Sequence, residues 1–153
     1  MQKETIAPFQ IIGISVRTSN QENKAAIDIP ALWNQFISEN IMDKIPNKIT
    51  SEVYSIYTNY EGDHTQPYDT ILGCKVSSLD NIPEGMIGKA FEGGKVAKFT
   101  AKGNLEDNIV YEAWLDIWGV HLNRTYTADF EVYGAKSMDR TNAEVDIFIA
   151  VSE

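Results

Sequence analysis

Aromatic side chains grouped with a single glutamate, Glu131, are the feature of this chain that could do chemistry. The chain has three tryptophans and seven tyrosines. A carboxylate walled by aromatic rings would trap a flat, hydrophobic cation, because ion pairing in a partly desolvated site adds to ring-face attraction of about 0.5 to 2 kcal/mol per ring. The residues that we expect to build such a ligand-binding site are Trp33, Tyr57, Tyr68, Trp114, Trp118, Glu131 and Tyr133.

Strand periodicity decides where the Glu131 side chain points. In a strand, Phe130 and Val132 face the core, which turns Glu131 to the opposite face together with Asp129 and Tyr133. Taken alone, this pattern fits a carboxylate in solvent, just as each aromatic ring taken alone fits a packed core. If Glu131 is buried among the rings, burial raises its pKa and an approaching cation lowers that pKa again.

Other site chemistries lack the residues they need. Cys74 is the only cysteine, so it forms no intramolecular disulfide, and its apolar neighbours predict a packed thiol in a buried strand. His64 and His121 are 57 positions apart, with no cysteine or histidine at metal-ligand spacing from either. The glycines, including Gly73, are interpreted as turn formers at the ends of elements and form no phosphate-binding pattern. We expect no metal and no cofactor.

Composition predicts one globular domain over residues 1–153. The chain is 43% hydrophobic and carries 13 basic against 22 acidic residues, a formal charge of −9. Such a field repels phosphate backbones and disfavours direct nucleic-acid binding. The apolar stretches are short and the N-terminus has no hydrophobic run, so we expect no signal peptide, no membrane span and a cytoplasmic location.

The elements that would position these residues occur in two similar series. The first predicts a strand at 9–16, a helix from 28 to near Pro46 with Pro30 in its first turn, and strands at 52–60 and 68–76 joined by a loop at 61–67. Residues 77–85 form a linker. The second series predicts a short strand at 87–91, a strand at 95–101, a helix at 109–118 ended by Gly119, and strands at 126–134 and 143–151.

The order strand, helix, strand, strand therefore occurs twice, over about residues 8–77 and 86–151. Aligning the halves matches Trp33 with Trp114 and Tyr57 with Glu131, which suggests an internal duplication. Two such units could join their strands into one antiparallel sheet or two half-sheets, with both helices on one side and a cleft between the units. The predicted fold class is α+β. A pseudo-twofold would bring Tyr57 and Glu131 toward that cleft.

Several segments together resemble the GyrI-like family of small-molecule-binding domains. They are Ile29-Pro30-Ala31-Leu32-Trp33, Tyr57-Thr58-Asn59-Tyr60-Glu61, Tyr68 with Gly73-Cys74-Lys75-Val76, and Asp129-Phe130-Glu131-Val132-Tyr133. The family comprises effector-binding domains of multidrug-responsive transcription activators of the AraC and MerR types and stand-alone versions of them. The resemblance runs from about Phe9 to Val151. It implies duplicated SHS2-like units with a central groove, in which a glutamate meets lipophilic cations, and Glu131 matches that glutamate.

Three functions follow from this resemblance. The first is a stand-alone binding protein for lipophilic organic cations. The second is a hydrolase of electrophilic compounds, with Glu131 as the general base on a water and Tyr57 or Tyr68 as a proton donor. The third is a protein-interaction module like the gyrase inhibitors of the family. Because the effector fold takes up all 153 residues and leaves none for a helix-turn-helix, any transcriptional role would need a protein partner.

Overall fold

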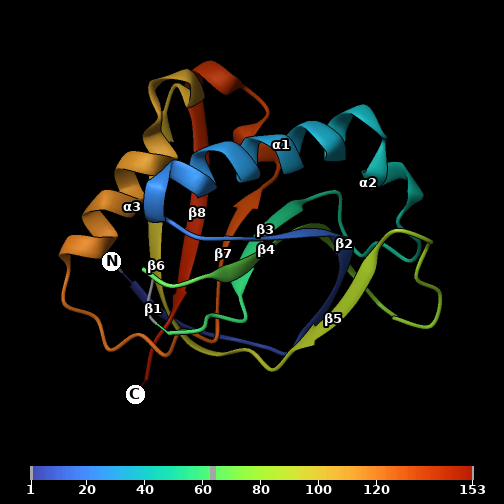
Figure 1. The fold of residues 1–153 in the computed structure, drawn as a ribbon, viewed down its shortest axis with the longest axis horizontal. Helices are drawn as coiled ribbons and strands as arrows, with labels where there is room; N and C mark the ends of the chain where they lie inside the picture. The colour runs from blue at the N-terminus through green and yellow to red at the C-terminus, as the bar shows by residue number, and fades with distance from the viewer. Residues whose placement is uncertain (1, 63–64, 153) are drawn as a thin grey trace.

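The protein is an eight-stranded antiparallel sheet with its helices on one side (Figure 1). The computed structural model describes residues 2–62 and 65–152, so His64 and part of the predicted 61–67 loop lie outside the described residues. The strands are β1 (Gln2–Ile6), β2 (Phe9–Thr18), β3 (Val53–Thr58), β4 (Tyr68–Val76), β5 (Ile87–Phe91), β6 (Gly94–Gly103), β7 (Ala128–Tyr133) and β8 (Ala143–Ala150). The helices are α1 (Lys24–Ser38), α2 (Ile41–Lys44) and α3 (Ile109–Gly119), with 3-10 turns at Gln21–Asn23, Leu105–Asp107, Ala135–Ser137 and Arg140–Asn142.

The strand order is β1-β6-β8-β7-β3-β4-β2-β5, with β3 and β7 at the centre. The order is symmetric about the β7–β3 pair: β1, β6, β8 and β7 on one side correspond to β5, β2, β4 and β3 on the other. Strand β1 therefore lies at one edge of the sheet beside β6, and β5 lies at the opposite edge beside β2. The α+β antiparallel fold is confirmed, and the sheet is continuous rather than two half-sheets. The duplication of residues 8–77 and 86–151 stays a prediction, with which this strand order is compatible.

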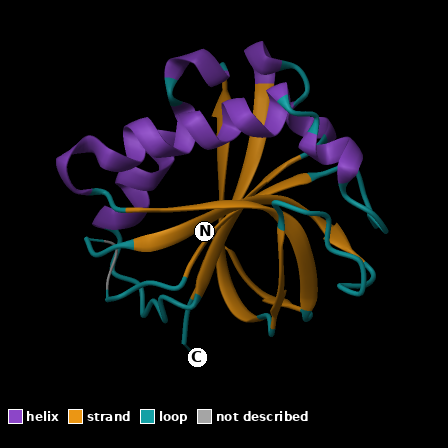
Figure 2. Ribbon diagram, turned by 45° about the vertical axis from the view of Figure 1, so that its right-hand side comes forward, coloured by secondary structure: helices purple, strands orange, loops and turns teal. Residues whose placement is uncertain are grey.

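The helices lie along one face of the sheet (Figure 2). The two long helices, α1 and α3, pack on opposite ends of that face. Leu32 and Phe36 of α1 are buried against β2 and β4, and Ile117 of α3 is buried against β6 and β8. The sheet residues under them are Ile12, Ile14, Leu72 and Cys74 at one end and Ala97, Ile147 and Ile149 at the other. Burial in the apolar cluster under α1 raises the pKa of the Cys74 thiol to about 11, which fits the predicted packed thiol. The middle of this face, over β3 and β7, lies between the helices.

The opposite face of the sheet is lined by a second apolar cluster. Phe9, Tyr54, Ile56 and Phe130 are all buried there. Since Phe130 points to this face, its neighbour Glu131 points to the helix-covered face, as the strand alternation predicts. The register pairs Glu131 with Ser55 across the two central strands. Both sides of β7 are therefore buried, and the carboxylate is not in solvent.

The helix boundaries differ from the prediction. Helix α1 begins at Lys24, so Pro30 lies inside it rather than in its first turn, and that expectation is wrong. The start is set by a backbone reversal, because Glu22 and Asn23 have positive φ values of 54° and 59°. Asn40, with φ of 51°, separates α1 from α2 where a single helix to Pro46 was expected. Within the described residues no helix is both long and apolar enough to cross a membrane.

Two strand details also differ. The edge strand β1 was not predicted, because its side chains are mostly exposed and it pairs with β6 through its backbone, which leaves no hydrophobic alternation. Gly73 was interpreted as a turn former but lies inside β4, opposite Gly13 of β2. A Cβ at Gly13 would lie 2.0 Å from the carbonyl oxygen of Leu72. These glycines therefore permit a close approach of two backbones within the sheet.

Candidate functional site

A cavity of about 750 Å³ lies between α1 and α3, over the central strands β3 and β7. The loop before α1, where Asn20 and Gln21 lie, and the start of α3 at Asn108 complete its wall. The structure brings all seven residues singled out from the sequence into this wall: Trp33, Tyr57, Tyr68, Trp114, Trp118, Glu131 and Tyr133. Their spatial grouping is a finding, and their role in binding a ligand stays a prediction.

Glu131 is the buried polar centre of the cavity, with only 2% of the residue exposed. Its Oε2 accepts hydrogen bonds from the Tyr57 hydroxyl at 2.9 Å and from the Trp114 indole nitrogen at 2.6 Å. Its Oε1 accepts one from the Tyr133 hydroxyl at 2.5 Å. Ser55 donates to the Tyr57 hydroxyl at 3.2 Å and extends the network along β3. Three neutral donors thus orient the carboxylate before any ligand arrives.

Burial and hydrogen bonding act in opposite directions on the acid. Burial raises the pKa of Glu131 above its usual 4.5, while the donors Tyr133, Trp114 and Tyr57 lower it in part. Burial first, and then the nearby Glu131 charge, raise the pKa of Tyr57 and Tyr133 well above 10. The two phenols therefore remain protonated donors at neutral pH. The carboxyl group can change protonation in response to a charge that enters the cavity.

Asp129, on the same face of β7, is buried but already neutralised. It is 0% exposed, and its Oδ2 is 2.7 Å from Nη2 of Arg124 and accepts from the Tyr60 hydroxyl at 2.6 Å. Its Oδ1 accepts from the backbone N–H of Ala150 at 2.8 Å. Among the described residues Glu131 has no cationic partner within 4.0 Å. Glu131 is therefore the unmatched negative charge of the cavity wall.

Ring contacts hold the aromatic wall in place. Tyr57 meets Tyr68 and Trp114 edge to face, with ring centroids 5.8 and 5.6 Å apart. Trp33 of α1 meets Tyr133 of β7 in the same way at 4.9 Å, which connects the helix to the strand that carries Glu131. Side chains locked by such contacts lose little further freedom when a ligand binds.

Among the wall residues that sequence reasoning missed, Arg124 and Tyr60 carry polar groups that bind a neighbouring acid. The available signal was Asp129, which shares its face with Glu131 and, once buried, needs a cation and donors. The loop that carries Arg124 gave no periodic pattern. No group of three or more histidine, cysteine, aspartate or glutamate side chains in 2–62 and 65–152 could hold a metal ion.

Comparison with known proteins finds a family and a relative that match nearly the whole chain. The family described as "Cass2: Integron-associated effector binding protein" matches residues 4–151. YobU of Bacillus subtilis (strain 168), described as a candidate transcriptional regulator, is 30% identical over 146 residues, which is 92% of this chain and 91% of YobU.

Two solved structures share the fold. The integron cassette protein VCH_CASS2, from the mobile metagenome of Vibrio cholerae, is 29% identical with a TM-score of 0.75 and covers 99% of this chain and 95% of its own. The structure of SAV2435 bound to tetraphenylphosphonium has a TM-score of 0.80 and covers 99% of this chain and 93% of its own. Its identity of 15% limits that likeness to the fold.

Proposed function

Because the chain belongs to the Cass2 family of integron-associated effector binding proteins, with a GyrI-like effector-binding fold, we propose that it binds amphipathic organic cations in the cavity between α1 and α3. In this proposal Glu131 is the counter-ion. The walls that contact the apolar part of the ligand are Trp33, Tyr57, Tyr68, Trp114, Trp118 and Tyr133.

One observation carries the proposal: Glu131 is a buried carboxylate in the wall of an aromatic cavity, with three neutral donors and no cation paired with it among the described residues. Leaving a charge in this state costs free energy unless a ligand supplies the opposite charge. At an effective dielectric constant of about 20, a monovalent cation about 5 Å away gains about 3 kcal/mol from the carboxylate. Ring faces add about 0.5 to 2 kcal/mol each.

The relatives support the same class of ligand. SAV2435 shares the fold and is bound to tetraphenylphosphonium, a lipophilic cation. YobU, the relative described as a candidate transcriptional regulator, supports a regulatory setting. We therefore propose further that the protein is cytoplasmic and acts in regulation when it binds its ligand. In this proposal any effect on transcription requires a protein partner.

The cavity also bears on the hydrolase alternative, because a buried carboxyl group with a raised pKa is suited to act as a general base. That activity stays a prediction. Product formed from an activated ester beyond one equivalent of protein would establish turnover, and its absence would leave binding alone.

Two ions of equal shape and opposite charge test the counter-ion directly. Tetraphenylphosphonium and tetraphenylborate each present four phenyl rings around one centre. We expect the phosphonium ion to bind with a stoichiometry of one and the borate ion to bind at least about tenfold more weakly, because Glu131 attracts the first and repels the second. Isothermal titration calorimetry measures both affinities. Equal affinities would refute the role of Glu131.

A further inference from the structure

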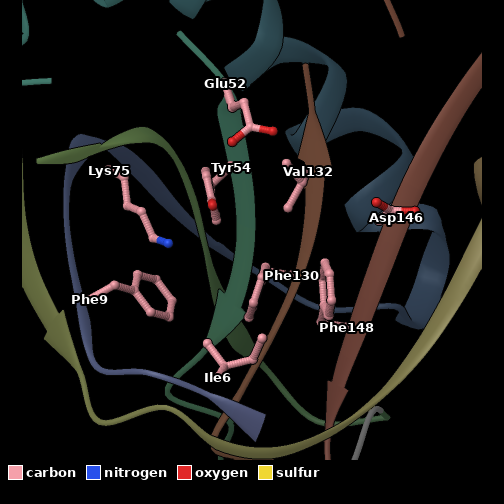
Figure 3. A pocket seen from close by; sticks show the side chains of 9 residues that line it. All are labelled: Ile6, Phe9, Glu52, Tyr54, Lys75, Phe130, Val132, Asp146 and Phe148. Carbon is pink, nitrogen blue, oxygen red and sulfur yellow. The ribbon is translucent and has the colours of Figure 1, made fainter. Parts of the chain in front are cut away.

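A second cavity, of about 170 Å³, lies on the face of the sheet that the helices do not cover (Figure 3). Strand β7 separates it from the first cavity, because Phe130 and Val132 face this one while Glu131 and Tyr133 face the other. Its lining consists of Ile6, Phe9, Glu52, Tyr54, Lys75, Phe130, Val132, Asp146 and Phe148. Nothing in the proposed cation site accounts for it.

Aromatic rings form most of the apolar wall of this cavity. Phe130 is at the centre, stacked on Phe148 with centroids 4.9 Å apart and edge to face with Phe9 at 5.5 Å. Tyr54 lies against Phe130 at 5.7 Å. The volume is close to that of an apolar cavity of about 150 Å³ that binds benzene. It therefore suits one aromatic ring.

Two charged side chains of opposite sign, Lys75 and Glu52, line the same cavity as these rings. The ammonium group of Lys75 lies 5.3 Å from the centroid of Phe9 and 5.6 Å from that of Tyr54 (Figure 3). Glu52 lies just before β3, whose ladder with β4 begins at Tyr54 and Gly73, and its side chain lines the same cavity as Lys75. Within the described residues neither Lys75 nor Glu52 is in an ion pair within 4.0 Å. A ligand with both charges can therefore bind between them.

The third charged group of the lining is already paired. Asp146 is 2.9 Å from the Lys136 ammonium and 3.9 Å from that of Lys98, and it accepts from the Thr100 hydroxyl at 3.0 Å. Within the described part of the chain, the charged side chains of this lining that are in no ion pair are thus Lys75 and Glu52. A ligand that carries only a carboxylate would leave Glu52 facing it, and one that carries only an ammonium would leave Lys75 facing it.

We propose that this second cavity binds a small zwitterionic aromatic molecule of the amino-acid type. Its single ring packs on Phe9, Phe130 and Phe148, its carboxylate pairs with Lys75 and its ammonium with Glu52. This second site is separate from the cation site and does not depend on Glu131.

L-Phenylalanine is the probe, and three chemical analogues each lack one of its functional groups. 3-Phenylpropionate lacks the ammonium, 2-phenylethylamine lacks the carboxylate, and L-alanine lacks the ring. Titration into the ¹⁵N-labelled protein should shift the amide signals of Phe130, Val132 and Phe148 saturably with phenylalanine. We expect each analogue to bind at least about fivefold more weakly than phenylalanine, since each loses one ion pair or the ring contact. Equal affinity of 3-phenylpropionate would refute the zwitterion.

Variants separate this site from the other cavity. Lys75→Met keeps the aliphatic stem and removes the charge, and it should weaken phenylalanine binding about fivefold. Lys89→Met, which removes a charge over the Phe91 ring outside this cavity, is the matched control and should leave the affinity unchanged. Val132→Phe should fill the cavity and abolish binding. Glu131→Gln, which alters the other cavity, should leave the affinity for phenylalanine at the wild-type value. No saturable shift at millimolar phenylalanine, or shifts at the Trp114 indole that Glu131→Gln removes, would overturn the proposal.

Discussion

Glu131→Gln is the perturbation that tests the cation site most directly, because the amide has the same shape and no charge. The carbonyl oxygen can take the place of Oε2, which accepts from Trp114 and Tyr57. The NH₂ group can then donate to the Tyr133 hydroxyl, since a phenol oxygen also accepts. The hydrogen-bond network therefore survives the substitution, and the charge is the main difference.

The expected loss of cation-binding free energy in Glu131→Gln follows from the burial of the carboxylate. The attraction of about 3 kcal/mol for a cation about 5 Å away is reduced by the cost of removing both charges from water. A net loss of about 1.5 to 3 kcal/mol raises the dissociation constant for tetraphenylphosphonium about tenfold to a hundredfold. The affinity for tetraphenylborate should stay the same or increase, because a repulsion is removed.

Intrinsic fluorescence provides the assay, since all three tryptophans of the chain, Trp33, Trp114 and Trp118, line the cavity. Glu112→Gln is the control, because Glu112 is exposed on α3 and the substitution removes the same charge. We expect quenching by tetraphenylphosphonium to need a higher concentration only in Glu131→Gln. If Glu131→Gln and the wild type are quenched with equal affinity, the carboxylate is not the counter-ion and the reasoning fails.

Three further predictions concern stability. Because burial raises the folded-state pKa of Glu131, its contribution to stability is greatest below the unfolded pKa of about 4.5 and is lost as the pH rises through the folded pKa. The Tm of Glu131→Gln should therefore increase relative to that of the wild type as the pH rises above about 4.5, and a constant difference in Tm would contradict this. Asp129→Asn leaves Arg124 buried without its partner and should cost about 3 to 5 kcal/mol in urea unfolding; a loss under about 1 kcal/mol would show that the pair is replaceable. Gly13→Ala should cost about 3 kcal/mol in the same assay, because its Cβ meets the carbonyl oxygen of Leu72 at 2.0 Å; wild-type stability would mean that β2 and β4 separate without penalty.

Local patterns were enough for the order of strands β2 to β8 with helices α1 and α3, and for the direction of Glu131. Alternation along β7 places Phe130 and Glu131 on opposite faces whatever the rest of the chain does, because successive strand residues point to opposite sides. Local patterns failed where the backbone alone forms the structure. Strand β1 is held by hydrogen bonds to β6, and Gly73 lies opposite Gly13 within a sheet, so neither gives a signal along the chain.

Residue types and their spacing determined that one strand carries two acids on one face and that aromatic rings follow in similar places in each half. Only the tertiary structure decided which acid is neutralised. Arg124 reaches Asp129, whereas Glu131 meets Tyr57, which is 74 residues away, and Trp114 of α3. Burial, charge pairing and pKa depend on the sum of contacts from segments that are distant in the chain, and no local pattern contains that sum.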